Sequence, residues 1–215
     1  MTRALAAILG VIAVTCPLRT AKPAVSADEC QPRLTIKVYN YSPAASQTMG
    51  HAEAEAGRIL LEAGIRVAWL NCRATSAKEN TAPACQGESV MSPILRIAPH
   101  AVESLGTLML GFTLPDPEGA IYATVVYSRV QELVRNHVAS ERKILGYGIA
   151  HEIGHVLLGS KHSASGLMRE QWSNSDWRLA DVEQLRFSQQ EAIAMRSEVA
   201  RRTKQTTDQA CSADR

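Results

Sequence analysis

The chain has 215 residues, 46% of them hydrophobic, and is long enough to bury the core of one domain. Its formal net charge is only +2, with 23 lysines and arginines against 21 aspartates and glutamates. So weak a charge, without a basic stripe interleaved with aromatic residues, argues against nucleic acid as a partner. We therefore expect one globular domain that does not bind nucleic acid.

The start of the chain has the pattern of a secretory signal peptide. Arg3 gives a positive start, residues 4–14 form an uninterrupted apolar run, and a polar stretch follows up to Ala27. Cleavage is expected near Ala27, and the run is too short for a permanent membrane span. Cys16 offers a lipid anchor as an alternative, although the residues before it match a lipobox poorly. The sequence thus predicts a secreted or periplasmic protein, with a single domain over residues 28–215.

Beyond the predicted cleavage site an even number of cysteines remains, in a protein expected in an oxidising compartment. They are Cys30, Cys72, Cys85 and Cys211. Cys72 and Cys85 bracket a polar loop and could pair locally, which would leave Cys30 to pair with Cys211; other pairings remain open. A zinc site built from these cysteines is the weaker interpretation, because the sequence contains no C-x-x-C pair.

The first half of the domain predicts a strand, a helix and a second strand. Residues 34–39 alternate as a strand does, residues 46–63 carry apolar side chains at helical spacing, and residues 65–70 form the next strand. A crossover of this length makes the two strands parallel neighbours. A further strand is expected at residues 94–97, and either one strand or two short ones at residues 120–127, after a segment rich in glycine and proline.

Helices are predicted for most of the remaining chain. One begins at Ser128, and a second runs from Ser140 to about Leu158, with three glycines that predict close packing against the sheet or the floor of a site. These glycines are Gly146, Gly148 and Gly154. A last helix begins at the capping box of Ser188 and Glu191, and the polar tail beyond residue 200 is expected to be loose unless Cys211 anchors it.

The helix that ends near Leu158 carries the residues of a zinc site. His151 and His155 lie four residues apart, so their imidazoles project side by side from one helical face. Glu152 can reach a metal-activated water without being a ligand itself. Gly159 allows the helix to end, so that the chain turns and brings His162 back as the third ligand.

This run resembles the metzincin clan of zinc metallopeptidases, whose pattern is H-E-x-x-H-x-x-G-x-x-H followed by a turn containing methionine. The spacing here is one residue longer before the glycine, as in divergent bacterial relatives. Met168 matches the methionine, which would form an apolar floor under the metal. If His162 were not the third ligand, Glu170 or Asp176 would be the alternatives.

The resemblance implies an α+β zincin with a mixed, mostly parallel sheet. An upper lobe would cover residues 30–159, a small lower lobe residues 160–200 and a polar tail residues 201–215, with Zn²⁺ in the cleft between the lobes. The implied activity is that of a monomeric endopeptidase, in which His151, His155 and His162 bind zinc and Glu152 is the general base. A peptide or protein substrate would lie along an edge strand, expected within residues 119–127.

Two other functions compete with this one. A secreted binding protein could keep the fold and the metal without catalysis, but a purely structural zinc site has no use for Glu152. A hydrolase of a non-peptide amide, such as a cell-wall linkage, fits the same residues. Trp172 and Trp177 could line a specificity pocket, although covering the lower lobe is the favoured interpretation. No role is assigned to the other histidines, which are His51, His100 and His137.

Overall fold

The computed structural model describes residues 33–72, 85, 92–101, 109–115, 121–136 and 138–213, with Pro115 and the last nine residues described by their backbone alone. The predictions for the signal peptide, for Cys16, for Cys30 and for His137 lie outside these residues, as does nearly all of the predicted loop at residues 73–90. No helix within the described ranges combines the length and apolar character needed to cross a membrane.

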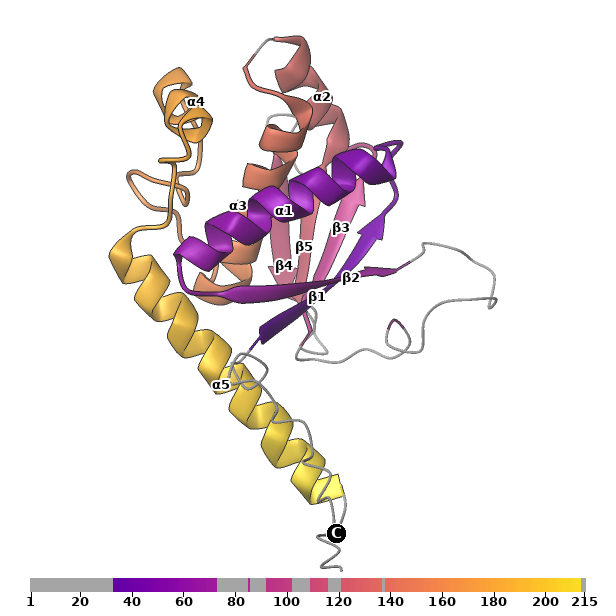
Figure 1. Ribbon diagram of the computed structural model, residues 1–215, viewed down its shortest axis with the longest axis vertical. Helices are drawn as coiled ribbons and strands as arrows, with labels where there is room; N and C mark the ends of the chain where they lie inside the picture. The colour runs from indigo at the N-terminus through magenta and orange to yellow at the C-terminus, as the bar shows by residue number, and fades with distance from the viewer. Residues whose placement is uncertain are drawn as a thin grey trace, which may run out of the picture. The chain divides into compact units, whose positions relative to one another are not determined.

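Five strands of the described chain form one sheet with the order β2-β1-β3-β5-β4 (Figure 1). β1 pairs in parallel with β2 and β3, and β3 pairs in parallel with β5. β4 runs antiparallel to β5 at the edge. The mixed, mostly parallel sheet is therefore confirmed. The strands are β1 (Arg33–Asn40), β2 (Arg66–Cys72), β3 (Ile94–Ala98), β4 (Gly111–Pro115) and β5 (Ile121–Val126).

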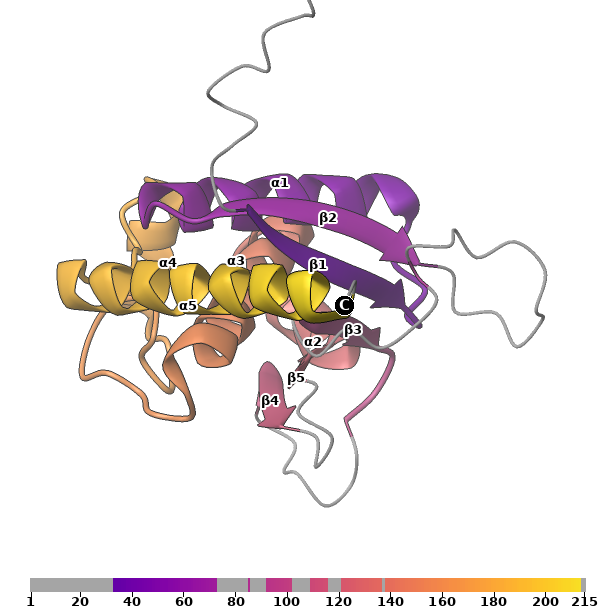
Figure 2. The same ribbon diagram turned by 90° about the horizontal axis from the view of Figure 1, so that it is seen from below.

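Two helices cover one face of this sheet. Ile36 of β1 is paired with Trp69 of β2, and the Trp69 indole lies 3.5 Å from where a Cβ would stand on Gly57 of α1. On the same face, Val125 of β5 lies 3.6 Å from the corresponding position at Gly148 of α3. Figures 1 and 2 both show α1 alongside β2. The helices are α1 (Ser46–Glu62), α2 (Tyr127–Arg135), α3 (Glu141–Leu158), α4 (Asn174–Asp181) and α5 (Gln189–Ala213).

The edge of the sheet differs from the prediction. Residues 119–127 were expected to provide the edge strand, but β5 is paired on both sides and β4 forms the edge instead. β4 was not predicted, because Gly111 and Pro115 bound a stretch of only three other residues, too short to show the alternation of a strand. An edge strand tolerates proline at its end, since one side of its backbone forms no ladder hydrogen bonds.

The C-terminal part holds two further differences. α4 was not predicted, yet Ser173 and Asp176 form a capping box in which the Asp176 carboxylate accepts from the Ser173 N–H at 2.7 Å. The tail expected to be loose continues α5 as far as Ala213. No glycine or proline lies between residues 189 and 213, so nothing in the sequence interrupts the helix.

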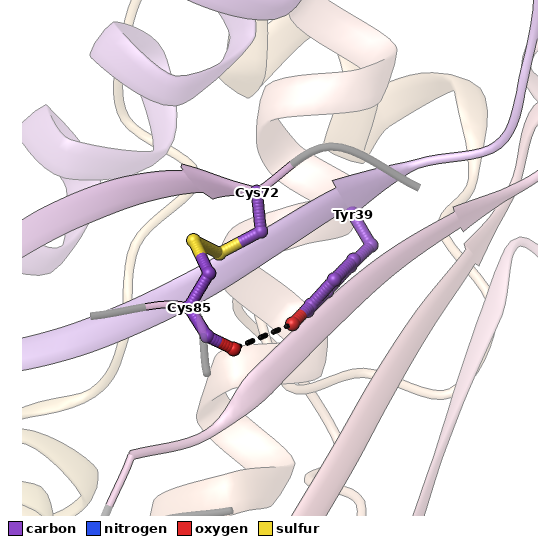
Figure 3. Close-up of a disulfide and its surroundings, with 3 residues drawn as sticks. All are labelled: Tyr39, Cys72 and Cys85. Atoms are coloured by element: carbon purple, nitrogen blue, oxygen red, sulfur yellow. Dashed lines mark hydrogen bonds between the residues drawn. A yellow bond between two sulfur atoms is a disulfide. The ribbon is translucent and has the colours of Figure 1, made fainter. Parts of the chain in front are cut away.

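Cys72 and Cys85 form a disulfide, which confirms the local pairing (Figure 3). The bond joins the end of β2 to a residue whose carbonyl accepts a hydrogen bond from the Tyr39 hydroxyl of β1 at 3.4 Å. The pairing of Cys30 with Cys211 lies outside what the structure describes, since Cys30 and the Cys211 side chain are not among its described parts. The disulfide therefore ties an edge of the sheet to the chain that follows it.

Replacing both Cys72 and Cys85 by serine is expected to lower the free energy of unfolding by about 3 kcal/mol, because a bridge over a loop of this size restricts the unfolded chain. The measurement is urea unfolding of the oxidised protein and of the double variant. Wild type under reducing conditions should unfold at the urea concentration of the variant. An unchanged midpoint would show that this bridge does not constrain the chain.

Candidate metal centre

The central helix α3 carries three of the four candidate residues and is buried along most of its length. Residues 144–157 are all buried, because α3 packs between α1, α2, α5 and the sheet. The helix ends at Gly159, whose φ of 84° is a conformation that a residue with a Cβ rarely adopts. The chain then reverses, so that His162 returns toward the helix as predicted.

The three predicted ligands converge on one point. The Nε2 atom of His155 lies 3.0 Å from Nε2 of His151 and 3.2 Å from Nε2 of His162. Within the described chain, these three are the only group of histidine, cysteine or carboxylate side chains whose donor atoms come together closely enough to hold a metal. Neither Glu170 nor Asp176, the alternative ligands, belongs to the group.

The hydrogen bonds of the two helix histidines show that a cation fits between the rings. Nδ1 of His151 lies 2.8 Å from the Leu167 carbonyl, and Nδ1 of His155 lies 2.9 Å from the Gly159 carbonyl. A carbonyl only accepts, so each Nδ1 carries the proton and each Nε2 of a neutral ring presents a lone pair. Lone pairs this close repel each other unless a positive ion lies between them.

The spacing also agrees with zinc. Ligands at a Zn–N distance of about 2.0–2.1 Å in a tetrahedral arrangement stand ~3.3–3.4 Å apart. Burial lowers the pKa of His151 to about 4, the proximity of His155 and His162 acts in the same direction, and the bond to the Leu167 carbonyl opposes it. Burial likewise lowers the pKa of His155. Both rings are thus neutral near pH 7, as metal ligands must be.

Met168 lies directly beneath α3, as expected for the floor of the site. It is only 1% exposed, and its sulfur is in contact with the space where a Cβ would stand on Gly154. Cε1 of Phe187 also lies close to this position, 2.9 Å from where the Cβ would stand. The prediction of close packing at Gly154 is confirmed, and the side chains packed there are Met168 and Phe187. Gly148 packs against Leu110 and against Val125 of the sheet, as predicted. Gly146 packs against Glu55 of α1 instead, and not against the sheet or the floor of the site.

Gly154→Ala is expected to destabilise the protein by about 1–3 kcal/mol, because the added methyl group would overpack a filled space. Urea unfolding of the metal-free protein measures the effect. Gly50→Ala in α1 is the matched control, since no atom lies within 4 Å of the new Cβ and the gain in helix propensity is up to about 1 kcal/mol. Equal stability of the two variants would contradict the tight packing of Met168 against α3.

Glu152 is only 3% exposed and is held by the edge strand β4. The Thr113 hydroxyl lies 2.8 Å from Oε2 of Glu152 and 3.1 Å from its main-chain oxygen. A Cβ on Gly111 would stand 2.6 Å from Oε1, so this position leaves no room for a side chain. Burial raises the pKa of Glu152 to about 8, against the opposing effect of the Thr113 hydrogen bond. A carboxyl group with such a pKa can accept and release a proton near neutral pH.

A cavity of about 560 Å³ opens beside these side chains. It is bounded by residues 109–114, by the histidines of α3 and by the segment that carries His162, Trp172 and Trp177. The Trp172 ring stands edge-on to His151 at 5.5 Å and donates from Nε1 to the Leu167 carbonyl at 3.0 Å. Both tryptophans line this cavity, so the specificity-pocket interpretation of Trp172 and Trp177 keeps its place beside the structural one.

The other side chains discussed in the sequence analysis either make structural contacts or lie on the surface. Asp176 caps α4 and pairs with Arg169 at 3.1 Å. His51 and His100 are exposed and take no part in the histidine group. Gly111 and Thr113 were not predicted as part of the site, and no local pattern could have revealed them, because their contact with Glu152 depends on how β4 pairs with β5.

The sheet, the buried histidine helix and the methionine packed against it define a metzincin-like fold, and the three imidazoles form a donor set that fits zinc. The particular likeness is to archaemetzincin. The crystal structure of archaemetzincin from Methanopyrus kandleri matches with a TM-score of 0.50 and 14% sequence identity, over 79% of this chain and 97% of that chain. No protein-family model matches the sequence, and no curated protein matches it either.

Proposed function

We propose that the protein is a zinc-dependent endopeptidase. The observation that carries the proposal is the convergence of His151, His155 and His162 with the buried carboxyl group of Glu152 beside the same cavity. Zinc held there supplies a Lewis acid that activates water and polarises a carbonyl. Glu152 takes the proton of the attacking water and passes it to the leaving amine. The fold shared with an archaemetzincin supports this assignment.

The edge strand supports a peptide as the substrate. The N–H of Val126 donates to the Leu110 carbonyl at 2.8 Å, so alternate residues of β4 bond to β5. The backbone groups of Gly111 and Thr113 therefore point toward the free side of the sheet that the structure describes. An extended peptide added to this edge would lie against the two residues that hold Glu152. This replaces the edge first expected at residues 119–127.

The test is hydrolysis of casein and of cell-wall peptides by the purified protein, with and without a chelator. Casein cleavage that the chelator abolishes and added zinc restores is the expected result. Cleavage of cell-wall amides alone would instead support the non-peptide hydrolase. Zinc binding without hydrolysis of either substrate would support a binding protein that keeps the fold and the metal.

We also propose that the protein is exported and loses its first 27 residues. The pattern of residues 1–27 supports this, and so does the Cys72–Cys85 disulfide, since such bonds persist in oxidising compartments. Mass spectrometry of the protein from the cell envelope and the medium should find an N-terminus near residue 28. A chain that retains Met1 and carries reduced Cys72 and Cys85 inside the cell would contradict export.

A further inference from the structure

His162 is held differently from the other two ligands. His151 and His155 are buried on α3, and each ring is fixed by an Nδ1 hydrogen bond to a carbonyl. His162 is exposed and belongs to the loop after Gly159. Its ring shows no hydrogen bond through Nδ1 in the part of the chain that the structure describes. The position of the third ligand therefore depends on how its backbone is held.

The next residue, Ser163, fixes that backbone at two points. Its N–H donates to the Met168 carbonyl at 2.8 Å, and it forms an isolated β-bridge with Arg169. Its hydroxyl donates to Oε1 of Glu191 at 2.5 Å. The bond from the Ser163 N–H to the Met168 carbonyl closes the methionine turn. The bond from the Ser163 hydroxyl to Glu191 joins this turn to a residue 28 positions further along the chain.

Glu191 is well placed to act as a fixed anchor. Its second oxygen accepts from the N–H of Ser188 at 2.7 Å, and its own N–H donates to the Ser188 hydroxyl at 3.2 Å, which completes the capping box of α5. The helix behind it is itself held: Met195 is fully buried, and Arg202 donates to the Val156 carbonyl of α3 at 2.8 Å. One carboxylate thus links the third ligand's loop to a helix packed on the metal helix.

We propose that Ser163 and Glu191 are positioning residues for zinc, which hold His162 at the distance from His151 and His155 that the metal requires. The proposal rests on the zinc site of the proposed function but not on peptide hydrolysis. Groups that orient ligands typically contribute roughly 10- to 100-fold in metal affinity. Because this pair acts through the backbone, and the bond from Ser163 N–H to Met168 remains, we expect a loss of about 10-fold.

The experiment measures zinc affinity by competition with a chromophoric chelator, together with the absorption spectrum of the Co²⁺-loaded protein, in the full-length mature chain. Ser163→Ala and Glu191→Ala should each weaken zinc binding by about 10-fold, and the double variant should be no weaker than either. Ser163→Thr keeps the hydroxyl and should restore the affinity. The visible bands of Co²⁺ should change in the two alanine variants, because the geometry of the third ligand changes.

Ser188→Ala is the matched control, because it removes the hydroxyl of the capping box and leaves the Ser163–Glu191 bond in place. It should lower the melting temperature of the metal-free protein without changing zinc affinity. The proposal is overturned if Ser163→Ala binds zinc within twofold of wild type, or if Ser188→Ala weakens binding as much as Ser163→Ala does. Failure of the endopeptidase proposal would appear separately, as zinc binding without hydrolysis.

Discussion

Glu152→Gln is expected to retain zinc and to lower kcat for peptide hydrolysis by about 10²- to 10⁴-fold, the usual contribution of a general base. The amide has the shape of the carboxyl group, so it fits between Gly111 and the Thr113 hydroxyl, which can still donate to its oxygen. An amide cannot take up the proton of the attacking water, however. Elemental analysis for zinc and initial rates on a peptide substrate measure the two effects.

The matched control is Glu53→Gln. Glu53 is also a buried helical glutamate, 7% exposed, whose carboxylate accepts from Asn71 at 3.2 Å, but it lies on α1 and is not among the residues that line the cavity. Its replacement should leave kcat within about twofold of wild type, as expected for a residue outside the reaction. Activity retained by Glu152→Gln would remove Glu152 from the mechanism, and a loss of zinc from this variant would make Glu152 a ligand instead.

The convergence of the three histidines could be predicted because their arrangement is mostly local. The placement of His151 and His155 follows from the helical repeat, and Gly159 provides the conformation that ends the helix at the required point. The chain needs only the few residues up to His162 to return to the same point. The spacing in the sequence was therefore sufficient to predict that the three histidines come together, although not the Ser163–Glu191 contact beside His162.

The surroundings of Glu152 could not be predicted, because they depend on contacts between distant residues. Thr113 is separated from Glu152 by 39 positions and reaches it only because β4 pairs with β5 beside α3. A short strand flanked by glycine and proline carries too few residues to show an alternating pattern. The strand that lies against the proposed general base was therefore not predicted.

Glu191 makes one contact that could be predicted from the sequence and one that could not. Its capping box with Ser188 was visible as two residues three positions apart, and the structure confirms it. Its bond to Ser163 could not be predicted, because the two residues are 28 positions apart and come together only in the folded chain. Local patterns thus predicted how α5 begins, but not that its first turn forms a hydrogen bond with Ser163.

His162→Ala is expected to weaken zinc binding by more than about 100-fold, beyond the loss typical of residues that only orient ligands. His162 is exposed, so its removal deletes a donor and little packing, and the metal-free variant should keep the wild-type melting temperature. Zinc should then raise the melting temperature of wild type much more than that of the variant, since ligand stabilisation follows affinity.

His51→Ala, which removes an exposed histidine on α1, is the control and should bind zinc as wild type does. Chelator competition and thermal unfolding with and without zinc distinguish the outcomes. If His162→Ala kept the wild-type affinity, the third ligand would have to come from elsewhere, and Glu170, which lines the same cavity, would be the next candidate. Loss of affinity in His162→Ala with none in His51→Ala would instead show that the metal needs all three imidazoles, as the close approach of their Nε2 atoms predicts.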